Sequence, residues 1–184
     1  MLCSGVVLAA GAGRRLGTPK AEVLLGGCRL VDRAVRTLDE GGCDEVVVVL
    51  REGQAPPGGD VIAVVNPDPD RGLSSSLRLA LAAVRLPHAL VTLVDRPGIG
   101  TDAIRTVLAA PGEVVAATYA GRRGHPIRIA RRYFDEVGEL AHADAGAREF
   151  LRRHPELVQE VECAGDARDL DTAQDLAFWR ARLD

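Results

Sequence analysis

Leu8-Ala-Ala-Gly-Ala-Gly-Arg-Arg-Leu-Gly-Thr-Pro-Lys20 is the stretch that decides the fold, and it overlaps a short apolar run from Gly5 to Ala10. The apolar run predicts a buried strand. Glycines in the loop allow backbone conformations closed to other residues and let N–H groups converge on an anion, while basic side chains add positive charge. The glycines are Gly11, Gly13 and Gly17, and the basic residues are Arg14, Arg15 and Lys20. The pattern predicts a polyphosphate site after the first strand.

Two better-known phosphate loops do not fit this stretch. The dinucleotide motif G-x-G-x-x-G fails because Gly17 comes one position too late, and the P-loop fails because Lys20 follows Pro19 rather than a glycine. A flexible strand-to-helix connection with solvated arginines remains the alternative interpretation of the glycines alone. The Pro19-Lys20 pair favours the phosphate site.

The order of residues in this loop resembles the signature L-A-A-G-x-S-x-R-M-G-x-P-K of the nucleotidyltransferases that attach a nucleotide to the pterin cofactor of molybdenum enzymes. It is most similar to their cytidylyltransferase branch, since guanylyl relatives more often have L-A-G-G and D-K. The resemblance implies that Arg15 and Lys20 contact the β- and γ-phosphates of a nucleoside triphosphate. Gly13 and Leu16 replace the serine and methionine of the signature. The implied nucleotide contacts in the loop are Leu8, Ala9, Ala10, Gly11, Gly13, Arg15, Gly17 and Lys20.

The composition predicts one soluble, globular domain over residues 1–184. Hydrophobic residues make up 47% of the chain, and no apolar run approaches the length of a membrane span. The first residues carry no basic region before their apolar stretch, so we expect no signal peptide and a cytoplasmic protein. A net charge of −3 and 3% aromatic residues argue against nucleic acid as a partner.

The four cysteines predict neither a disulfide framework nor a zinc site. They are scattered, with no C-x-x-C pair and no histidine at ligand spacing. We expect buried thiols at Cys3, Cys28, Cys43 and Cys163.

Strand and helix patterns alternate along the whole chain. Leu30 to Leu38 has the spacing of a helix packed on one face, Gly41-Gly42 ends it, and the β-branched run from Glu45 to Leu50 is typical of a strand in a parallel sheet. Further strands are expected at 61–65, 88–95 and 113–118 and after 121, and further helices after 72, at 101–110, from 144 and after 171. We therefore predict an α/β fold with a mostly parallel sheet and helices on both faces. The family resemblance implies a three-layer, Rossmann-like nucleotidyltransferase domain.

A second motif, Asn66-Pro-Asp-Pro-Asp-Arg-Gly-Leu-Ser-Ser-Ser-Leu-Arg78, precedes and begins a predicted helix. It resembles the family's N-P-x-x-x-x-G-x-S-x-S-L-R segment, which lies over the base and ribose. The resemblance implies nucleotide contacts from Asn66, Gly72 and Ser76. A turn followed by a helix with a serine N-cap is the alternative.

The strand that begins at His88 delivers Asp95 to its carboxyl end, directly before Arg96-Pro97. Mg²⁺ is usually held by one or two carboxylates together with substrate phosphates, so this position suits a magnesium ligand. The D-x-P pattern matches the family, although many relatives have glutamine in place of Arg96. A solvated aspartate in a turn is the alternative.

Three later positions match family motifs as well. His125 lies in a G-H-P motif and Arg148 in a segment resembling G-D-x-G-A-R, and both are expected to contact the acceptor. Asp171, in a segment resembling D-I-D-T-P-E-D-L, is expected to be a second metal ligand. Arg148 could instead pair with a nearby carboxylate, and Asp171 could instead form a capping box with Gln174.

The resemblance implies transfer of CMP from CTP to the terminal phosphate of molybdopterin, with Mg²⁺ as the cofactor, pyrophosphate as the leaving group and a molybdenum hydroxylase as recipient of the product. Arg15, Lys20 and Asp95 would be the catalytic residues. Another small phosphorylated acceptor or GTP remains open. A nucleotide-binding or oxidoreductase relative without transfer activity also remains open, with Arg96 neutralising Asp95 in place of a metal.

Overall fold

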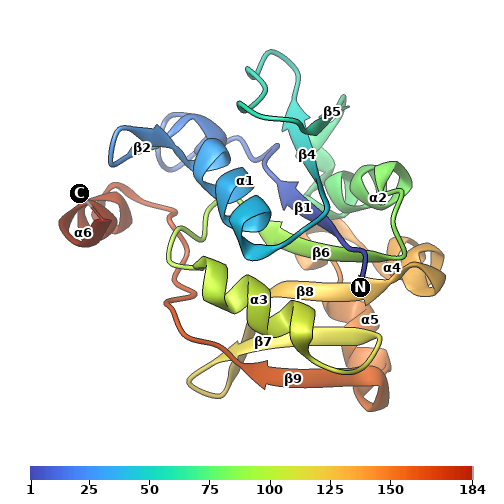
Figure 1. Cartoon of the computed structure of the whole chain (residues 1–184). Coiled ribbons are helices and arrows are strands. Elements are labelled where there is room, and N and C mark those ends of the chain that lie inside the picture. Colours follow the sequence, from blue (N-terminus) through green and yellow to red (C-terminus); the bar gives the residue numbers. More distant parts are fainter. Residues whose placement is uncertain (184) are drawn as a thin grey trace.

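A seven-stranded sheet forms the middle layer of the computed structural model, which describes residues 1–183 (Figure 1). Its strands are β1 (Ser4–Leu8), β4 (Glu45–Arg51), β5 (Ile62–Asn66), β6 (His88–Leu93), β7 (Val114–Tyr119), β8 (Arg122–Ala130) and β9 (Val158–Glu162), in the spatial order β5-β4-β1-β6-β8-β7-β9. A separate two-stranded hairpin pairs β2 (Leu24–Leu25) with β3 (Cys28–Arg29). The helices are α1 (Leu30–Gly41), α2 (Leu73–Ala83), α3 (Thr101–Ala109), α4 (Phe134–Leu140), α5 (Arg148–Arg153) and α6 (Ala173–Leu183).

The register of β1 places the first loop beside the end of β6. β1 runs parallel to both β4 and β6, and Leu8 lies opposite Val49 on one side and Leu93 on the other. Because the carboxyl ends of these three strands meet at one edge, the loops after Leu8 and Leu93 are neighbours there. The fold thus brings the phosphate loop next to Asp95.

Helices cover both faces of the sheet, which confirms the predicted three layers (Figure 1). On one face α1 and α3 pack over a core that includes Val7 and Ile104, and on the other α2, α4 and α5 pack over Leu77 and Phe150. The β-branched residues of β4 are buried on both faces, as expected for a strand in the middle of such a sheet. α1 ends at Gly42, whose φ of 102° closes the helix in a left-handed turn.

The predicted mostly parallel sheet is confirmed, with one strand as the exception. β8 runs antiparallel to both β6 and β7, whereas β1, β4, β5, β6, β7 and β9 form parallel pairs with their remaining neighbours. A tight turn after Tyr119 links β7 to β8, and a turn that short can join only antiparallel strands.

Two local predictions were wrong. α2 has Gly72 as its N-cap with no side-chain cap, so no serine caps it, because all three serines lie inside the helix. No α-helix opens at Asp144, since residues 143–145 form a 3-10 turn and α5 begins at Arg148.

Arg128 anchors the end of α3 from inside the protein. Its side chain is 1% exposed, and the guanidinium donates hydrogen bonds of 2.7–2.9 Å to four carbonyl oxygens in and just after the last turn of α3. These carbonyls belong to Val107, Leu108, Ala110 and Gly112. Helix ends leave such carbonyls without intrahelical partners, so this arginine satisfies them.

The four cysteines are free thiols, and burial raises the pKa of the Cys3 thiol to about 12. Cys28 is partly exposed, which corrects the expectation that all four are buried. Within residues 1–183, no helix combines the length and the apolar character needed to cross a bilayer.

Candidate active site

A cleft of about 920 Å³ opens at the carboxyl ends of β1 and β6. Most of the residues predicted for substrate or metal contact line it, although they come from distant parts of the chain. These are Leu8, Ala10, Gly11, Lys20, Gly72, Ser76, Asp95, His125, Arg148 and Asp171. The fold therefore places residues predicted to contact the donor, the metal and the acceptor around one cleft.

The loop after β1 folds back on itself at Gly13. Its φ is +60°, and a Cβ atom there would lie 1.9 Å from the carbonyl oxygen of Thr18, so no side chain fits. The carbonyl of Gly13 accepts hydrogen bonds from the N–H groups of Leu16 and Gly17. Within the described residues, no N–H group of residues 10–15 donates to a protein acceptor. These groups are available to phosphate oxygens.

A smaller hollow of about 390 Å³ adjoins the cleft, and both share Lys20 and Asp171. Gly13 and Arg15 line this hollow. Two residues of the predicted loop set lie elsewhere. Ala9 is fully buried in the core, and Gly17 lies outside both volumes.

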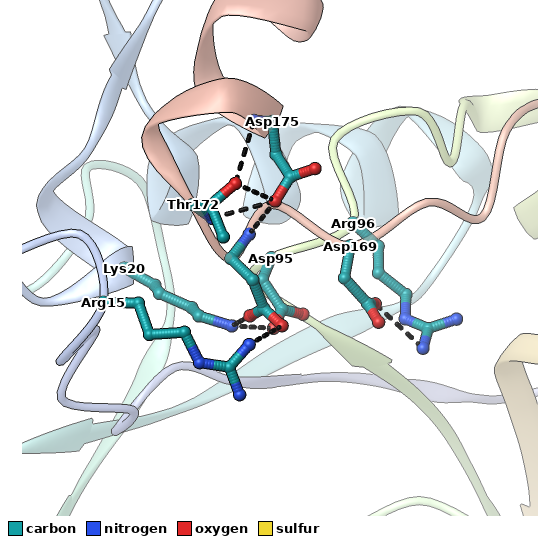
Figure 2. Close-up of polar contacts among 8 residues, drawn as sticks. Arg15, Lys20, Asp95, Arg96, Asp169, Thr172 and Asp175 are labelled. Carbon is teal, nitrogen blue, oxygen red and sulfur yellow. Dashed lines mark hydrogen bonds and ion pairs between the residues drawn. The ribbon is translucent and has the colours of Figure 1, made fainter.

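The ammonium of Lys20 brings Asp95 and Asp171 together, because it contacts both carboxylates, and Figure 2 shows its contact with Asp95. Lys20 Nζ lies 2.5 Å from Asp95 Oδ2 and also donates to Asp171 Oδ1, while Arg15 lies 3.3 Å from Asp171 Oδ2. The side chains of Lys20 and Asp95 are each 17% exposed. Burial lowers the pKa of Lys20, but the two carboxylates raise it by more, so its net pKa lies above the ordinary value.

Asp171 reaches the cleft because the segment between β9 and α6, residues 163–172, crosses the end of β6. We call this segment the C-terminal strap. Its Leu170 N–H donates to the carbonyl of Asp95 at 2.8 Å, and its Asp166 N–H donates to the carbonyl of Gly98 at 3.3 Å. Trp179 of α6 also packs against Gly98. Main-chain contacts therefore fix the position from which Asp171 projects.

The carboxylate of Asp171 is not the cap of α6, which corrects the predicted capping box with Gln174. Thr172 is the capping residue instead: its hydroxyl accepts from the Asp175 N–H, and Asp175 Oδ2 accepts from the Thr172 N–H at 2.9 Å (Figure 2). The box is shifted by one residue, because threonine and aspartate both serve as caps and the sequence offers both. Asp171 thereby keeps both carboxylate oxygens for the site.

The donor set suits a divalent cation such as Mg²⁺. Asp95 Oδ1 is buried and has no hydrogen-bond partner within residues 1–183, although a carboxylate oxygen normally finds one when buried. Those residues contain no cluster of three or more His, Cys, Asp or Glu side chains arranged for a metal. Two carboxylates with room for substrate phosphates are nevertheless the usual magnesium arrangement. Asp95 and Asp171 would hold the cation.

Arg96 does not neutralise Asp95. Its guanidinium lies 2.9 Å from Asp169 of the strap, on the far side of the carboxylate pair (Figure 2). Burial raises the pKa of Asp169, and the negative charges of Asp95 and Asp171 raise it further against the opposing effect of Arg96. Arg96 thus forms its ion pair with the strap, and Asp95 forms its ion pair with Lys20.

In the second motif, Ser76 lines the cleft, whereas Asn66 is 1% exposed and lies behind it. The Asn66 amide donates to the hydroxyl oxygens of Ser75 and Ser76, both at 2.9 Å, and its Oδ1 accepts from the Asp68 N–H. All of these contacts are within the protein. Asn66 therefore orients Ser76 at the wall of the cleft and is not itself exposed to it.

The part of the cleft expected for the acceptor is neutral at His125 and positive around it. His125 Nδ1 is buried without a hydrogen-bond partner in the described part of the chain. Burial and the positive charges of Arg96 and Arg148 hold the pKa of His125 well below its ordinary value, so its ring is uncharged near neutral pH. Arg148 is exposed and forms no ion pair within residues 1–183, since Glu149 pairs with two other arginines.

Among the charged residues that line the cleft, Arg123 and Asp169 were not identified from the sequence as candidates. Arg123 precedes His125 by two positions in β8, and alternation along a strand places such residues on one face. That spacing could have identified Arg123, which pairs with Glu160 of β9. Asp169 gave no signal, because its role depends on the course of the strap.

Comparison with known proteins points to one family. The family model described as "MobA-like NTP transferase domain" matches residues 5–158. The chain is 38% identical to nicotine blue oxidoreductase of Paenarthrobacter nicotinovorans over 94% of each chain. It is 36% identical to a probable molybdenum cofactor guanylyltransferase of Chloroflexus aggregans, over 54% of this chain and 49% of that protein. It is 24% identical to the molybdenum cofactor cytidylyltransferase of Escherichia coli, over 67% of this chain and 64% of that protein.

Solved structures agree with the fold and include a metal complex. Rv0371c of Mycobacterium tuberculosis H37Rv superimposes with a TM-score of 0.83 at 27% identity, covering 98% of each chain. The same protein solved as a complex with manganese has a TM-score of 0.78 at 27% identity and covers 99% of this chain and 100% of that one.

Proposed function

Because this chain belongs to the MobA-like NTP transferase family, we propose that it is a Mg²⁺-dependent cytidylyltransferase that transfers CMP from CTP to the terminal phosphate of molybdopterin and releases pyrophosphate. One observation carries the proposal. Two carboxylates that are distant in the sequence, Asp95 and Asp171, meet beside a loop of free N–H groups and basic side chains in a single cleft. That combination suits a nucleoside triphosphate and its metal ion.

The triphosphate would lie along the loop after β1. The free N–H groups of residues 10–15 would donate hydrogen bonds to oxygens of the β- and γ-phosphates. Arg15 and Lys20 would place positive charge beside the negative charge that builds up on the leaving pyrophosphate. Ser76, held by Asn66, would contact the nucleoside. The phosphate end of the substrate therefore lies at the smaller hollow and the nucleoside in the larger cleft.

The reaction requires positioning and no protein nucleophile. An oxygen of the acceptor phosphate attacks the α-phosphorus in line, the bond from that phosphorus to the β-phosphate oxygen breaks, and pyrophosphate leaves with the electron pair. A phosphate monoester is largely ionised near neutral pH because its second pKa is about 6, so no general base is needed. We expect no covalent intermediate between the enzyme and the nucleotide.

Asp95 and Asp171 would hold Mg²⁺, which when bound lowers the charge on the phosphates and orients them. The buried, unpaired Asp95 Oδ1 supports this role. The manganese complex of Rv0371c supports a divalent cation in this family. The acceptor would contact Arg148, Arg123 and the neutral His125. Two arginines beside an uncharged imidazole suit an acceptor that carries an anionic group next to a less polar ring system.

The relatives support the acceptor and leave the choice of base open. Both a cytidylyltransferase and a guanylyltransferase of the molybdenum cofactor are similar to this chain. The loop residues Ala9-Ala10-Gly11 and Pro19-Lys20 favour CTP within the proposal, because guanylyl relatives more often have L-A-G-G and D-K. Two variants of the proposal would suit the same site: GTP as the donor, or another small phosphorylated molecule as the acceptor.

A second candidate function is an oxidoreductase activity. Nicotine blue oxidoreductase is 38% identical over 94% of this chain, which makes it the relative with the more extensive similarity among those compared above. In this chain the cleft would then hold a reduced dinucleotide with its pyrophosphate on the loop after β1. The pair of carboxylates, Asp95 and Asp171, would have no evident task in hydride transfer, which is why transfer of a nucleotide is preferred.

The test is pyrophosphate release in the presence of Mg²⁺ with CTP, GTP, ATP and UTP in turn, with and without molybdopterin released from a denatured molybdenum enzyme. We expect release that requires both CTP and the pterin. Asp95→Asn should abolish it, whereas Asp102→Asn, an 81% exposed side chain on α3, should not change it.

The same preparations should be offered NADH and NADPH with nicotine blue while the absorbance of the reduced cofactor is followed. Oxidation of the cofactor without pyrophosphate release from any nucleotide would replace the transferase proposal with the oxidoreductase one. Release with GTP alone would keep the reaction and change the donor.

A further inference from the structure

Lys20 is the single lysine of this chain. The other 22 of its 23 lysine and arginine residues are arginines. That lysine lies where two carboxylates of the cleft, Asp95 and Asp171, converge. An ammonium is a compact point charge, whereas a guanidinium is a wide planar fork. The gap between Asp95 and Asp171 is thus filled by the side chain whose head most closely resembles a small cation.

The contacts of Lys20 are those of a cation between two ligands. Its Nζ donates to one oxygen of each carboxylate, and its side chain is 17% exposed. The second oxygen of Asp95 stays buried and unpaired within residues 1–183. The ammonium therefore balances the pair of negative charges without saturating the oxygens that a metal would use.

Lys20 also lies within reach of the phosphate position. It lines both the cleft and the smaller hollow, directly after the loop with the free N–H groups. Arg15 already contacts Asp171 from the hollow at 3.3 Å. A rotation of the long lysine side chain toward the hollow would exchange two carboxylates for phosphate oxygens while keeping the charge paired.

We propose that Lys20 is an exchangeable counter-cation, which holds the place of the divalent cation between Asp95 and Asp171 until metal and nucleotide bind and then moves onto the phosphates. The proposal rests on the proposed function in that it takes these two carboxylates as the metal ligands. It predicts that metal and ammonium compete for one site in the free protein. It also predicts that the triphosphate relieves this competition by offering Lys20 new partners.

The first experiment measures Mn²⁺ binding to the whole protein by calorimetry, without nucleotide and then with CTP. Lys20→Gln should bind Mn²⁺ at least about tenfold more tightly than the natural sequence when CTP is absent, because a competing charge beside the site is gone. CTP should tighten Mn²⁺ binding more in the natural protein than in Lys20→Gln. Arg85→Gln is the matched control, because it removes the same charge from an exposed position before β6, at the opposite end of that strand.

The outcomes separate this proposal from the function. Equal or weaker Mn²⁺ binding by Lys20→Gln, with binding still abolished by Asp95→Asn, would overturn the exchange of Lys20 and leave the metal site intact. Absence of Mn²⁺ binding in every variant, with or without CTP, would overturn both.

A second readout needs no substitution at Lys20. Because the chain has one lysine, acetylation by an amine-selective reagent reports on that side chain alone when followed by peptide mass spectrometry. Mg²⁺ alone should raise the rate of Lys20 acetylation several-fold by freeing the amine from the carboxylates, and Mg²⁺ with CTP should suppress it. The response to Mg²⁺ should vanish in Asp95→Asn. A rate of Lys20 acetylation that does not change with Mg²⁺ in the natural protein would contradict the proposed movement of Lys20.

Discussion

The backbone N–H of Leu170 donates to the carbonyl oxygen of Asp95, so the C-terminal strap is attached to the same residue whose side chain faces Asp171. A main-chain contact of this kind does not depend on the identity of the side chain at 170. It makes the distance between the two carboxylates a property of the backbone. The strap is therefore the part of the fold on which assembly of the site most depends.

Substitution at Gly98 should displace the strap. A Cβ atom there would lie 2.3 Å from the Trp179 ring and 2.4 Å from the carbonyl oxygen of Asp166. We expect Gly98→Ala to lower the free energy of unfolding by about 1–3 kcal/mol, as overpacking does, and to weaken Mn²⁺ binding. Urea unfolding and calorimetry measure the two effects. Gly58→Ala, where no atom lies within 4 Å, should alter neither, and an unchanged Gly98→Ala protein would show that the strap does not depend on this contact.

The shifted capping box separates stability from metal binding at adjacent positions. Thr172→Ala should lower the free energy of unfolding by about 1 kcal/mol, since the N-cap of α6 is lost, and should leave Asp171 in place. Asp171→Asn should leave stability within about 0.5 kcal/mol and weaken Mn²⁺ binding. Thr106→Ala, inside α3, is the control. A larger stability loss in Asp171→Asn than in Thr172→Ala would restore the original assignment of the cap.

His125 should make the protein less stable in acid. Its pKa is lowered in the folded state, first by burial and then by Arg96 and Arg148, so the unfolded chain binds the proton more readily. Stability from this residue is therefore present above the unfolded pKa of about 6.5 and is lost as the pH falls below it. Urea unfolding between pH 5 and 8 should show a smaller loss toward acid for His125→Gln than for the natural protein. Parallel pH profiles would contradict this.

Arg128 should contribute to stability far more than a surface arginine. Arg128→Met would leave four carbonyl oxygens at the end of α3 without their donor, at about 1 kcal/mol or more each. We expect a loss of at least about 3 kcal/mol in the free energy of unfolding. Arg122→Met, an exposed position in the same strand, should stay within about 0.5 kcal/mol. Similar unfolding midpoints for the two variants would rule out the anchoring role.

The strand and helix pattern could be predicted from local sequence, because the buried residues follow simple periods. The β-branched run of β4 and the apolar spacing of α1 were sufficient to place those elements within a few residues. The antiparallel direction of β8 was not specified locally. Strand direction depends on the connection, and the apolar pattern that predicts a strand after 121 does not show how short the turn after Tyr119 is.

The candidate site was predictable where each residue directly follows an element or belongs to a motif, as with Lys20, Asp95 and Asp171. The partners of these residues were not predictable. Arg96 is next to Asp95 in sequence but pairs with Asp169, because the strap arrives from a distant part of the chain. Asn66 turns inward toward Ser76 of its own motif, a choice that depends on how the chain turns between them. Proximity in sequence therefore misjudged the electrostatics around the carboxylates.

Lys20 and Asp171 are separated by 151 positions, yet they share one hydrogen bond at the centre of the cleft. During synthesis the loop and Asp95 leave the ribosome well before Asp171 does. Until then the ammonium has a single carboxylate, and a nascent chain could hold a triphosphate only through the loop. Asp171 follows all seven strands of the described sheet in the chain, so translation delivers the second carboxylate only after those strands have been made.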